Sequence, residues 1–258
     1  DGMMRLVRLV WALLVLAMAG PALAQEVSDA VTISSPDGSV EVRIGTDGGE
    51  GHPTWTLSRK GKLIIAPSRL GFLLSDGLAF DRGFTVIGSE RGAGDSTWEL
   101  PWGERRFVRD HYNEAVIRYR QAENRGSRLM NIRVRVFDDG IGFRYEVPEQ
   151  SGLKTMNIAE ELSEFTIAPK GTAWWIPGGE FNRYEQLYQR TPIDAISTAH
   201  TPVTMRLDDG THLVFHEAAL VDYSAYWLKR ASGQKFRTTL SPSSRGPRVT
   251  RALPMNTP

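Results

Sequence analysis

Short runs of alternating apolar and polar residues, each followed by a turn sequence, constrain the fold of this chain more than any other feature. Residues 31–44 read VTISSPDGSVEVRI, so two alternating runs flank Ser-Pro-Asp-Gly. Residues 129–147 repeat this arrangement around Asp-Asp-Gly, and residues 203–215 do so around a second Asp-Asp-Gly. Asp-Gly between alternating runs is a strong signal for a β-hairpin. The chain is therefore expected to fold as a series of antiparallel hairpins.

The run at residues 129–137 shows the alternation most clearly. Met130, Ile132, Val134 and Val136 lie on one side of an extended chain, and Asn131, Arg133 and Arg135 lie on the other. This is the pattern of a half-buried antiparallel strand. Further strands are expected at residues 54–57, 62–65, 70–74, 84–87, 115–120, 164–167, 172–176, 226–228 and 235–240. Helical spacing occurs only near residues 158–162, over about one turn. These features favour a large all-β sandwich or barrel.

The N-terminus has the pattern of an export signal. Arg5 and Arg8 precede an apolar run at residues 9–19, and Ala22-Leu23-Ala24 follows as a cleavage site. The alternative is a membrane anchor, but the run is shorter than the roughly 20 apolar residues of a spanning helix. Residues 1–24 are therefore predicted to be a signal peptide, with Asp1 and Gly2 as an addition ahead of the start Met. The mature chain is expected in the periplasm or outside the cell.

The composition excludes several classes of function. There is no Cys, which removes disulfides, thiol nucleophiles and thiolate zinc sites. Lys and Arg number 31 and Asp and Glu number 30, so there is no electrostatic case for binding nucleic acid or an anionic membrane. No second apolar stretch is long enough to span a membrane. The remaining length, about 230 residues, suits one large β domain.

Residues 174–188, WWIPGGEFNRYEQLY, place aromatic side chains beside carboxylates. Aromatic faces cover the C–H groups of a sugar ring, and carboxylates bind hydroxyls or a cation. Pro-Gly-Gly interrupts strand pairing, so the segment is expected to form a loop at the edge of a sheet. The alternative interpretation is that Trp174 and Trp175 are core residues and the rest is a solvated loop.

Three other clusters are polar. One surrounds His111, Asn113 and Glu114, another is residues 138–146, and the third begins at His216-Glu217. Each has a structural alternative: turn chemistry, an exposed strand face or a strand end. Zinc binding at His111 is disfavoured because neighbouring strand residues point apart. A glycosidase needs two carboxyl groups roughly 5 to 10 Å apart. The sequence offers candidates for such a pair, but it does not fix their separation.

Eight sequence words identify a resemblance. They are SPDG (35–38), PSRLGF (67–72), TWELPWGE (97–104), RDHYNE (109–114), FDDGIGFRYEVPEQ (137–150), WWIPG (174–178), HEAALVDY (216–223) and NTP (256–258). In this order and spacing, they resemble the N-terminal domain of glycoside hydrolase family 97, the exported α-glucosidases and α-galactosidases of bacteria. The resemblance covers essentially all of the mature chain.

The resemblance implies a β-super-sandwich over residues 25–253. Residues 254–258 would begin the linker to a catalytic (β/α)₈ barrel, which a C-terminal β domain follows. In this family the acid and base carboxylates lie on the barrel, so residues 25–258 alone are expected not to hydrolyse anything. The implied partners are an oligosaccharide substrate, the barrel and the C-terminal domain.

The resemblance also implies a calcium ligand from this domain. In the calcium-dependent branch, a Glu three residues before a Tyr provides it. Glu185 fits this spacing from Tyr188. Glu180 is the rival, because the distance from Gly178 to Glu185 is about one residue longer than the family pattern. The remaining ligands would come from the barrel and water. Candidates for the pocket or the domain interface are Trp175, Tyr184, His216, Glu217, His111 and Asn113.

Two other functions remain open: a free-standing carbohydrate-binding β-sandwich, and a structural exported β protein without a ligand. The sequence does not decide between glucoside and galactoside, although a calcium-binding Glu favours the glucosidase branch. It also leaves open whether hydrolysis inverts or retains configuration.

Overall fold

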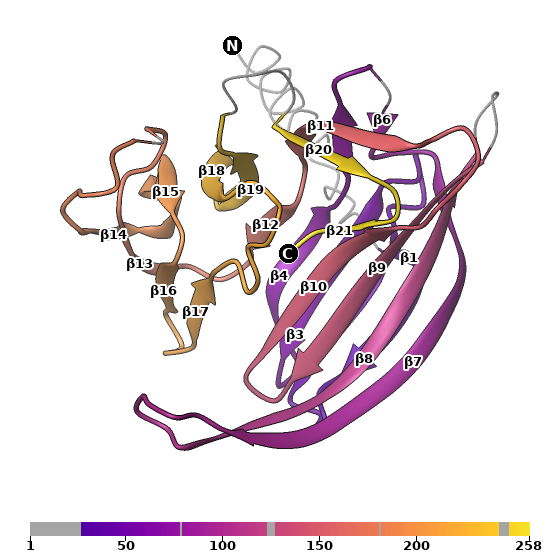
Figure 1. The fold of residues 1–258 in the computed structure, drawn as a ribbon. Helices are drawn as coiled ribbons and strands as arrows, with labels where there is room; N and C mark the ends of the chain where they lie inside the picture. Colours follow the sequence, from indigo (N-terminus) through magenta and orange to yellow (C-terminus); the bar gives the residue numbers. More distant parts are fainter. Residues whose placement is uncertain (1–26, 78, 123–126, 181, 243–247) are drawn as a thin grey trace, which may run out of the picture.

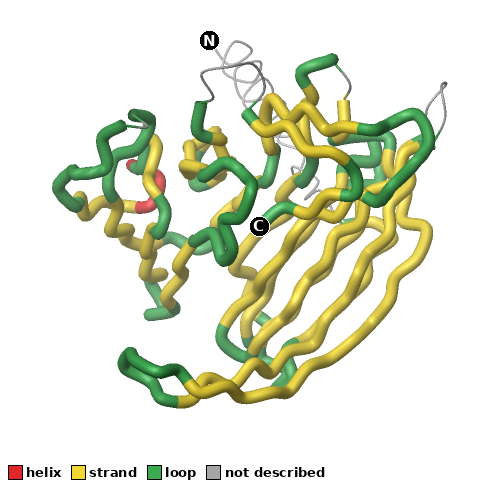
Figure 2. Tube along the Cα trace, in the orientation of Figure 1, coloured by secondary structure: helices red, strands yellow, loops and turns green. Residues whose placement is uncertain are grey.

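The computed structural model describes residues 27–77, 79–122, 127–180, 182–242 and 248–258. Strands make up nearly all of the regular structure (Figures 1 and 2), so the predicted all-β class is confirmed. The one helical element in these ranges is a single 3₁₀ turn, η1 (Ile193–Ala195). No helix among these residues is long and apolar enough to cross a membrane. The predicted signal peptide, residues 1–24, lies outside the described residues.

An eight-stranded antiparallel sheet forms one layer. Its order is β1-β2-β3-β4-β12-β19-β18-β15. The strands are β1 (Ser28–Ser34), β2 (Val40–Thr46), β3 (Pro53–Arg59), β4 (Lys62–Arg69), β12 (Glu164–Ile167), β19 (Lys235–Leu240), β18 (Tyr226–Ser232) and β15 (Thr198–His200). The predicted hairpin around Ser-Pro-Asp-Gly joins β1 to β2. Gly38 has φ +73°, which a glycine adopts without strain.

A five-stranded antiparallel sheet packs against it (Figure 1). Its order is β21-β10-β9-β8-β7. The strands are β21 (Met255–Asn256), β10 (Gly140–Val147), β9 (Arg128–Phe137), β8 (Phe107–Gln121) and β7 (Phe84–Glu99). The predicted alternation in β9 is confirmed. Met130, Ile132, Val134 and Val136 are each at most 1% exposed.

Two four-stranded sheets make up the rest of the strand structure in the described residues. One has the order β20-β11-β5-β6 and the other β14-β13-β16-β17. The strands are β20 (Val249–Ala252), β11 (Thr155–Glu161), β5 (Phe72–Leu74), β6 (Ala79–Phe80), β14 (Gln189–Pro192), β13 (Gly171–Trp175), β16 (Val203–Leu207) and β17 (His212–Phe215). Figure 1 shows β13, β14, β16 and β17 at one side of the molecule, next to β15 at the end of the eight-stranded sheet.

The core lies between the two large sheets. Trp55 on β3 packs on Phe143 on β10, with ring centroids 5.5 Å apart. The buried Tyr119 on β8 donates a hydrogen bond to the Gly45 carbonyl oxygen at 3.0 Å, which satisfies its hydroxyl inside the core. Burying each large apolar side chain stabilises the fold by about 1.5–3 kcal/mol. The facing sheets therefore form the sandwich that the sequence predicted.

A long hairpin extends past this sandwich. Strands were predicted at residues 84–87 and 115–120, but β7 and β8 run much further and stay paired from Phe84–Gln121 to Glu99–Phe107. Both faces of β7 are largely exposed beyond its first residues, so no apolar alternation marks it. Gly94 has a packing reason: a Cβ there would lie 2.6 Å from Tyr112 Cζ.

Residues 158–162, which showed about one turn of helical spacing, do not form a helix. Residues up to Glu161 belong to β11, which pairs with both β5 and β20. The helical spacing is accidental: Met156 and Ile158 are two residues apart and fully buried, as in a strand.

Candidate functional site

The loop between β13 and β14 is anchored by tryptophan. Trp175 is buried, and its indole N–H donates to Thr191 Oγ1 at 3.0 Å. Trp174 is only partly buried and stacks under the Arg190 guanidinium, 5.5 Å from its ring centroid. The described residues between 176 and 188 form no strand beyond one bridging position, Pro177. The prediction of a loop at these residues is confirmed, and of the two tryptophans only Trp175 belongs to the core.

Tyr184 holds this loop to the eight-stranded sheet. Its ring packs edge-on against His200, with centroids 4.8 Å apart, while 49% of the residue stays exposed. His200 Nδ1 in turn accepts a hydrogen bond from the Trp227 indole N–H at 3.1 Å. At Gly178 the backbone passes so close that a Cβ would lie 3.0 Å from Trp227. The loop therefore has a defined position on β15 and β18.

Glu180 and Glu185 are both exposed on this loop. Neither carboxylate makes a hydrogen bond or ion pair with another described residue. A free carboxylate on an irregular loop is a suitable calcium ligand, because calcium binds six to eight oxygens in flexible geometry. No group of three or more His, Cys, Asp or Glu among the described residues could hold a metal. The exposed carboxylates of Glu180 and Glu185 are therefore chemically suited to bind calcium.

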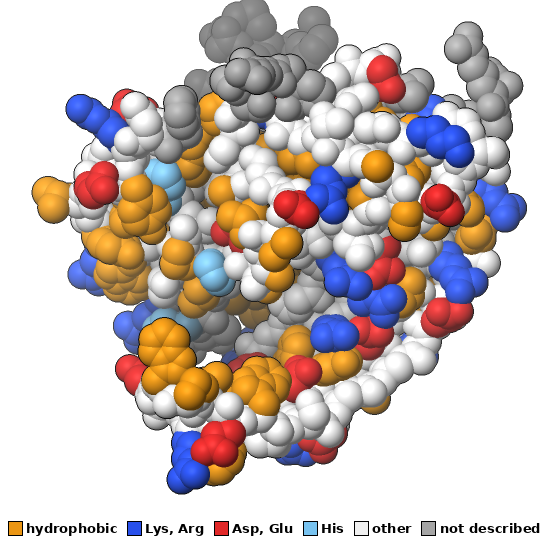
Figure 3. Space-filling view, viewed as in Figure 1, with side chains coloured by type: hydrophobic (Ala, Val, Ile, Leu, Met, Phe, Trp, Pro, Cys, Tyr) orange, Lys and Arg blue, Asp and Glu red, His pale blue; other side chains and the backbone are white. Residues whose placement is uncertain are grey.

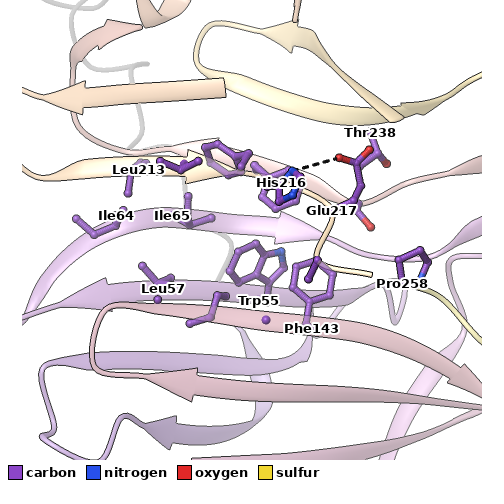
Figure 4. Close-up of a pocket in the computed structure, with 18 of the residues that line it drawn as sticks. Trp55, Leu57, Ile64, Ile65, Phe143, Leu213, His216, Glu217, Thr238 and Pro258 are labelled. Carbon is purple, nitrogen blue, oxygen red and sulfur yellow. Dashed lines mark ion pairs between the residues drawn. The ribbon is translucent and has the colours of Figure 1, made fainter. Parts of the chain in front are cut away.

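His216 and Glu217 border a cavity of about 610 Å³. Glu217 is the better fixed of the two: its Oε2 accepts from Thr201 Oγ1 at 2.5 Å, and its Oε1 accepts from the Tyr226 N–H at 3.0 Å. His216 Nδ1 lies 4.0 Å from Glu217 Oε2, and its side chain is 63% exposed (Figure 4). Glu217 is therefore fixed by two hydrogen bonds, whereas His216 lies exposed at the rim of the cavity.

Neighbouring residues of β15 and β18 contact both the loop and Glu217 at the cavity. His200, which Tyr184 covers, is followed by Thr201, the donor to Glu217. Tyr226, whose N–H binds Glu217, is followed by Trp227, the donor to His200. The structure thus brings Trp175, Tyr184, His216 and Glu217 to one side of the molecule.

His111 and Asn113 serve a different place. His111 Nδ1 lies 3.9 Å from Asp138 Oδ2, and Asn113 Nδ2 donates to the Ser34 carbonyl oxygen at 2.8 Å. The Asp37 N–H donates to Asp138 Oδ1 at 2.9 Å. These contacts join β8 to the end of β1 and to the turn between β9 and β10, and no described contact of His111 or Asn113 reaches residues 174–188.

The polar face of β8, β9 and β10 is an ion-pair network. Arg133 donates to Glu114 at 2.5 Å and to Glu146 at 2.6 Å, while Arg135 donates to Glu114 and Arg144 to Glu146. Burial alone would raise the pKa of Glu114 and of Glu146. The arginine contacts outweigh it, so both pKa values are lowered. This strand face, predicted simply as exposed, is therefore a structured network.

Sequence reasoning missed a buried acid, Glu161, at the end of β11. Its carboxylate accepts from Ser163 Oγ at 2.7 Å and from the Tyr223 hydroxyl at 2.8 Å. Burial raises the pKa of Glu161, and the charge of Glu217 adds to the rise. Tyr145 completes the chain: its hydroxyl accepts from the Gly71 N–H and donates to Ser163. The signal was a Glu in a buried-strand pattern, which the accidental helical spacing concealed.

Comparison with known proteins establishes the family. Residues 33–258 match the family model described as Glycosyl-hydrolase 97 N-terminal. The chain therefore belongs to this family, which confirms the resemblance inferred from its sequence words. It spans about a third of the length of the curated relatives that it matches.

Curated relatives and solved structures that resemble this chain are glycoside hydrolases. A probable retaining α-galactosidase of Streptomyces bingchenggensis is 28% identical over 221 residues, which are 84% of this chain and 33% of the relative. The retaining α-galactosidase of Bacteroides thetaiotaomicron is 23% identical, over 78% of this chain and 30% of the relative. A family 97 enzyme from Pseudoalteromonas sp. strain K8, solved with acarbose, superposes with TM-score 0.83 at 37% identity, covering 88% of this chain and 34% of that chain.

Proposed function

We propose that this chain is the non-catalytic N-terminal domain of an exported α-glycosidase. In this role it packs on a catalytic (β/α)₈ barrel and forms one side of the substrate pocket. The observation that carries the proposal is the anchored loop between β13 and β14. This loop exposes Tyr184 and Glu185 to solvent, and it belongs to the segment that matches the family 97 N-terminal model. Relatives about three times as long as the matched segment support a place within a larger enzyme.

Glu185 is proposed as the calcium ligand from this domain, with Glu180 as the rival. Both carboxylates are exposed and unpaired among the described residues, so neither would have to break an existing contact to bind a cation. Tyr184, next to Glu185, fixes the backbone through its contact with His200. Bound calcium would stabilise negative charge and orient groups in the pocket. Glu185 contributes one charged oxygen ligand to that site.

The substrate is proposed to be an α-glucoside. The 37% identical structures were solved with the oligosaccharides acarbose and panose, which supports an oligosaccharide substrate and a glucosidase-like pocket. The curated relatives, named as retaining α-galactosidases, are less similar, at 23% and 28% identity. Trp175 lies too deep to stack on a sugar, so Tyr184 is the aromatic face proposed for this role.

The test uses the complete enzyme and its Glu185→Gln and Glu180→Gln variants. Hydrolysis of 4-nitrophenyl α-glucoside and α-galactoside is followed across a calcium titration. We expect Glu185→Gln to lower the rate and the calcium dependence together, and Glu180→Gln to change little. Unchanged kinetics in Glu185→Gln, with calcium still bound, would transfer the assignment to Glu180.

The mature domain alone, residues 25–258, provides the companion measurement. It is expected to hydrolyse neither substrate and to bind calcium weakly, because it supplies one ligand. Micromolar calcium affinity by calorimetry would contradict the shared site. Export is checked on the same protein, since N-terminal sequencing of secreted material should begin at Gln25.

A further inference from the structure

The cavity beside Glu217 has aromatic walls from four strands. Trp55 and Phe143 come from the two large sheets, and Phe165 and Phe215 come from β12 and β17. The Phe165 and Phe215 rings lie 5.1 Å apart. Figure 4 shows Trp55 and Phe143 facing Leu213 and His216 from opposite sides. The volume of the cavity, about 610 Å³, lies within the range of small-molecule binding sites. Figure 3 shows this face of the molecule hollowed between the sheet of β13, β14, β16 and β17 and the rest of the sandwich.

The polar groups at one end of the cavity are acidic. Glu161 and Glu217 both line it and both are buried, Glu161 being 8% exposed and the Glu217 side chain 9%. Their hydrogen-bond donors are hydroxyls and one backbone N–H. Neither acid pairs with a Lys or Arg among the described residues. Their nearest cationic candidate, His216, is largely exposed and 4.0 Å from Glu217.

Three other residues with charged or imidazole side chains line the cavity, and none of them forms an ion pair or hydrogen bond with Glu161 or Glu217 in the described part of the chain. Arg59, Asp139 and His212 also line the cavity. Asp139 precedes β10 and His212 begins β17, while Arg59 is the last residue of β3; Tyr145 lies near the end of β10, and Glu217 follows the end of β17. Burying a carboxylate without a nearby cation is costly, because hydroxyl donors carry only partial charge. Among the described residues, the two acids therefore have no Lys or Arg partner.

The walls restrict which cation can pair with these acids. No group of three His, Cys, Asp or Glu in the described ranges could hold a metal ion. An ammonium group on an apolar body matches both the acidic end and the aromatic walls, and aromatic faces themselves attract cations.

We propose that this cavity binds a small organic cation, an amine on an aromatic or aliphatic body. The ammonium group lies against Glu161 and Glu217, and the body lies between Trp55, Phe143 and Phe215. The site is separate from the calcium and substrate roles proposed for residues 180–188, and it does not depend on them.

The test is calorimetric titration of this chain at neutral pH with three matched indoles. Tryptamine carries an ammonium group, tryptophol a neutral hydroxyl, and indole-3-acetate a carboxylate. We expect tryptamine to bind at least tenfold more tightly than tryptophol, which is about 1.4 kcal/mol, with indole-3-acetate weakest. Equal affinity for tryptamine and tryptophol, or no binding of tryptamine at millimolar concentration, would overturn the proposal.

Variants separate the site from general binding. Glu217→Gln keeps the size of the side chain and should bring the tryptamine-to-tryptophol ratio close to one. Leu213→Trp should fill the cavity and abolish binding of both, even if Glu217→Gln folds poorly. Glu160→Gln is the matched control, since Glu160 precedes Glu161 on β11 and is exposed. Loss of the preference in Glu160→Gln would also contradict the proposal.

Discussion

Two groups of partly or fully buried acids in this domain have pKa values shifted in opposite directions. On the face of β8 to β10, Glu114 and Glu146 share arginines, and their pKa values fall below the usual range. At the cavity, Glu161 is bound only by hydroxyls, and its pKa is raised, first by burial. The first group lies at the surface of a sheet and the second between sheets. The difference shows that the hydrogen-bond partner decides the effect of a buried acid. With arginine partners, the ionised acid stabilises the folded state at neutral pH; with hydroxyl partners alone, ionisation of the acid costs stability.

The largest effect is expected from Arg133→Met. This change removes the guanidinium that bridges Glu114 and Glu146 and leaves both partly buried acids short of a partner. Hydrogen bonds to charged groups are worth about 1.5–3 kcal/mol, so unfolding in urea should show a loss of about 2 kcal/mol. Arg118→Met is the matched control. Arg118 pairs with Glu90 on the exposed hairpin, and this pair should be worth less than about 1 kcal/mol. Equal losses of unfolding free energy in the two variants would mean that Arg133 in the network contributes no more than Arg118 in a single exposed ion pair.

A smaller effect, with a defined pH sign, is expected from Glu114→Gln. The folded pKa of Glu114 lies below its ordinary value of 4.5, so its stabilisation is present above that value and is lost as the pH falls. The variant should therefore be less stable than the wild type at neutral pH, and the gap should narrow under acid. Urea unfolding at about pH 7 and about pH 3.5 measures this. A gap of constant size would remove the electrostatic explanation.

The smallest effect, and the opposite sign, is expected from Glu161→Gln. The folded pKa of Glu161 is raised above 4.5, so the folded state keeps its proton where the unfolded chain has released it. The wild type then loses stability as the pH rises through this interval, and a glutamine does not. The variant should match the wild type near about pH 4 and resist more urea near about pH 8. A variant that is less stable at the higher pH would show that the charge of Glu161 is needed for folding.

Alternation and turn chemistry predicted the hairpins and the buried side of β9, because both signals are local. They did not predict the reach of β7 and β8. Where neither face is buried there is no alternation to detect, and the pairing comes from the partner strand. Glu161 was missed for a related reason: its burial depends on Ser163 and Tyr223, and Tyr223 lies 62 positions further along the chain. The loop with Glu185 was predicted because Pro-Gly-Gly forces it, whereas its anchor on His200 is a tertiary contact.

Pairing of β21 with β10 has a consequence for the order of folding. Thr257 donates its N–H to the Tyr145 carbonyl oxygen, and its hydroxyl accepts the Tyr145 N–H, both at 3.0 Å. These bonds join residues 112 positions apart. Hairpins such as β1–β2 can form as soon as they are made, but the edge of β10 is covered only after residues 255–257 have been made. During synthesis, this edge therefore stays open to other strands until residue 257 has left the ribosome, and an unpaired strand edge is a site for mispairing with other chains.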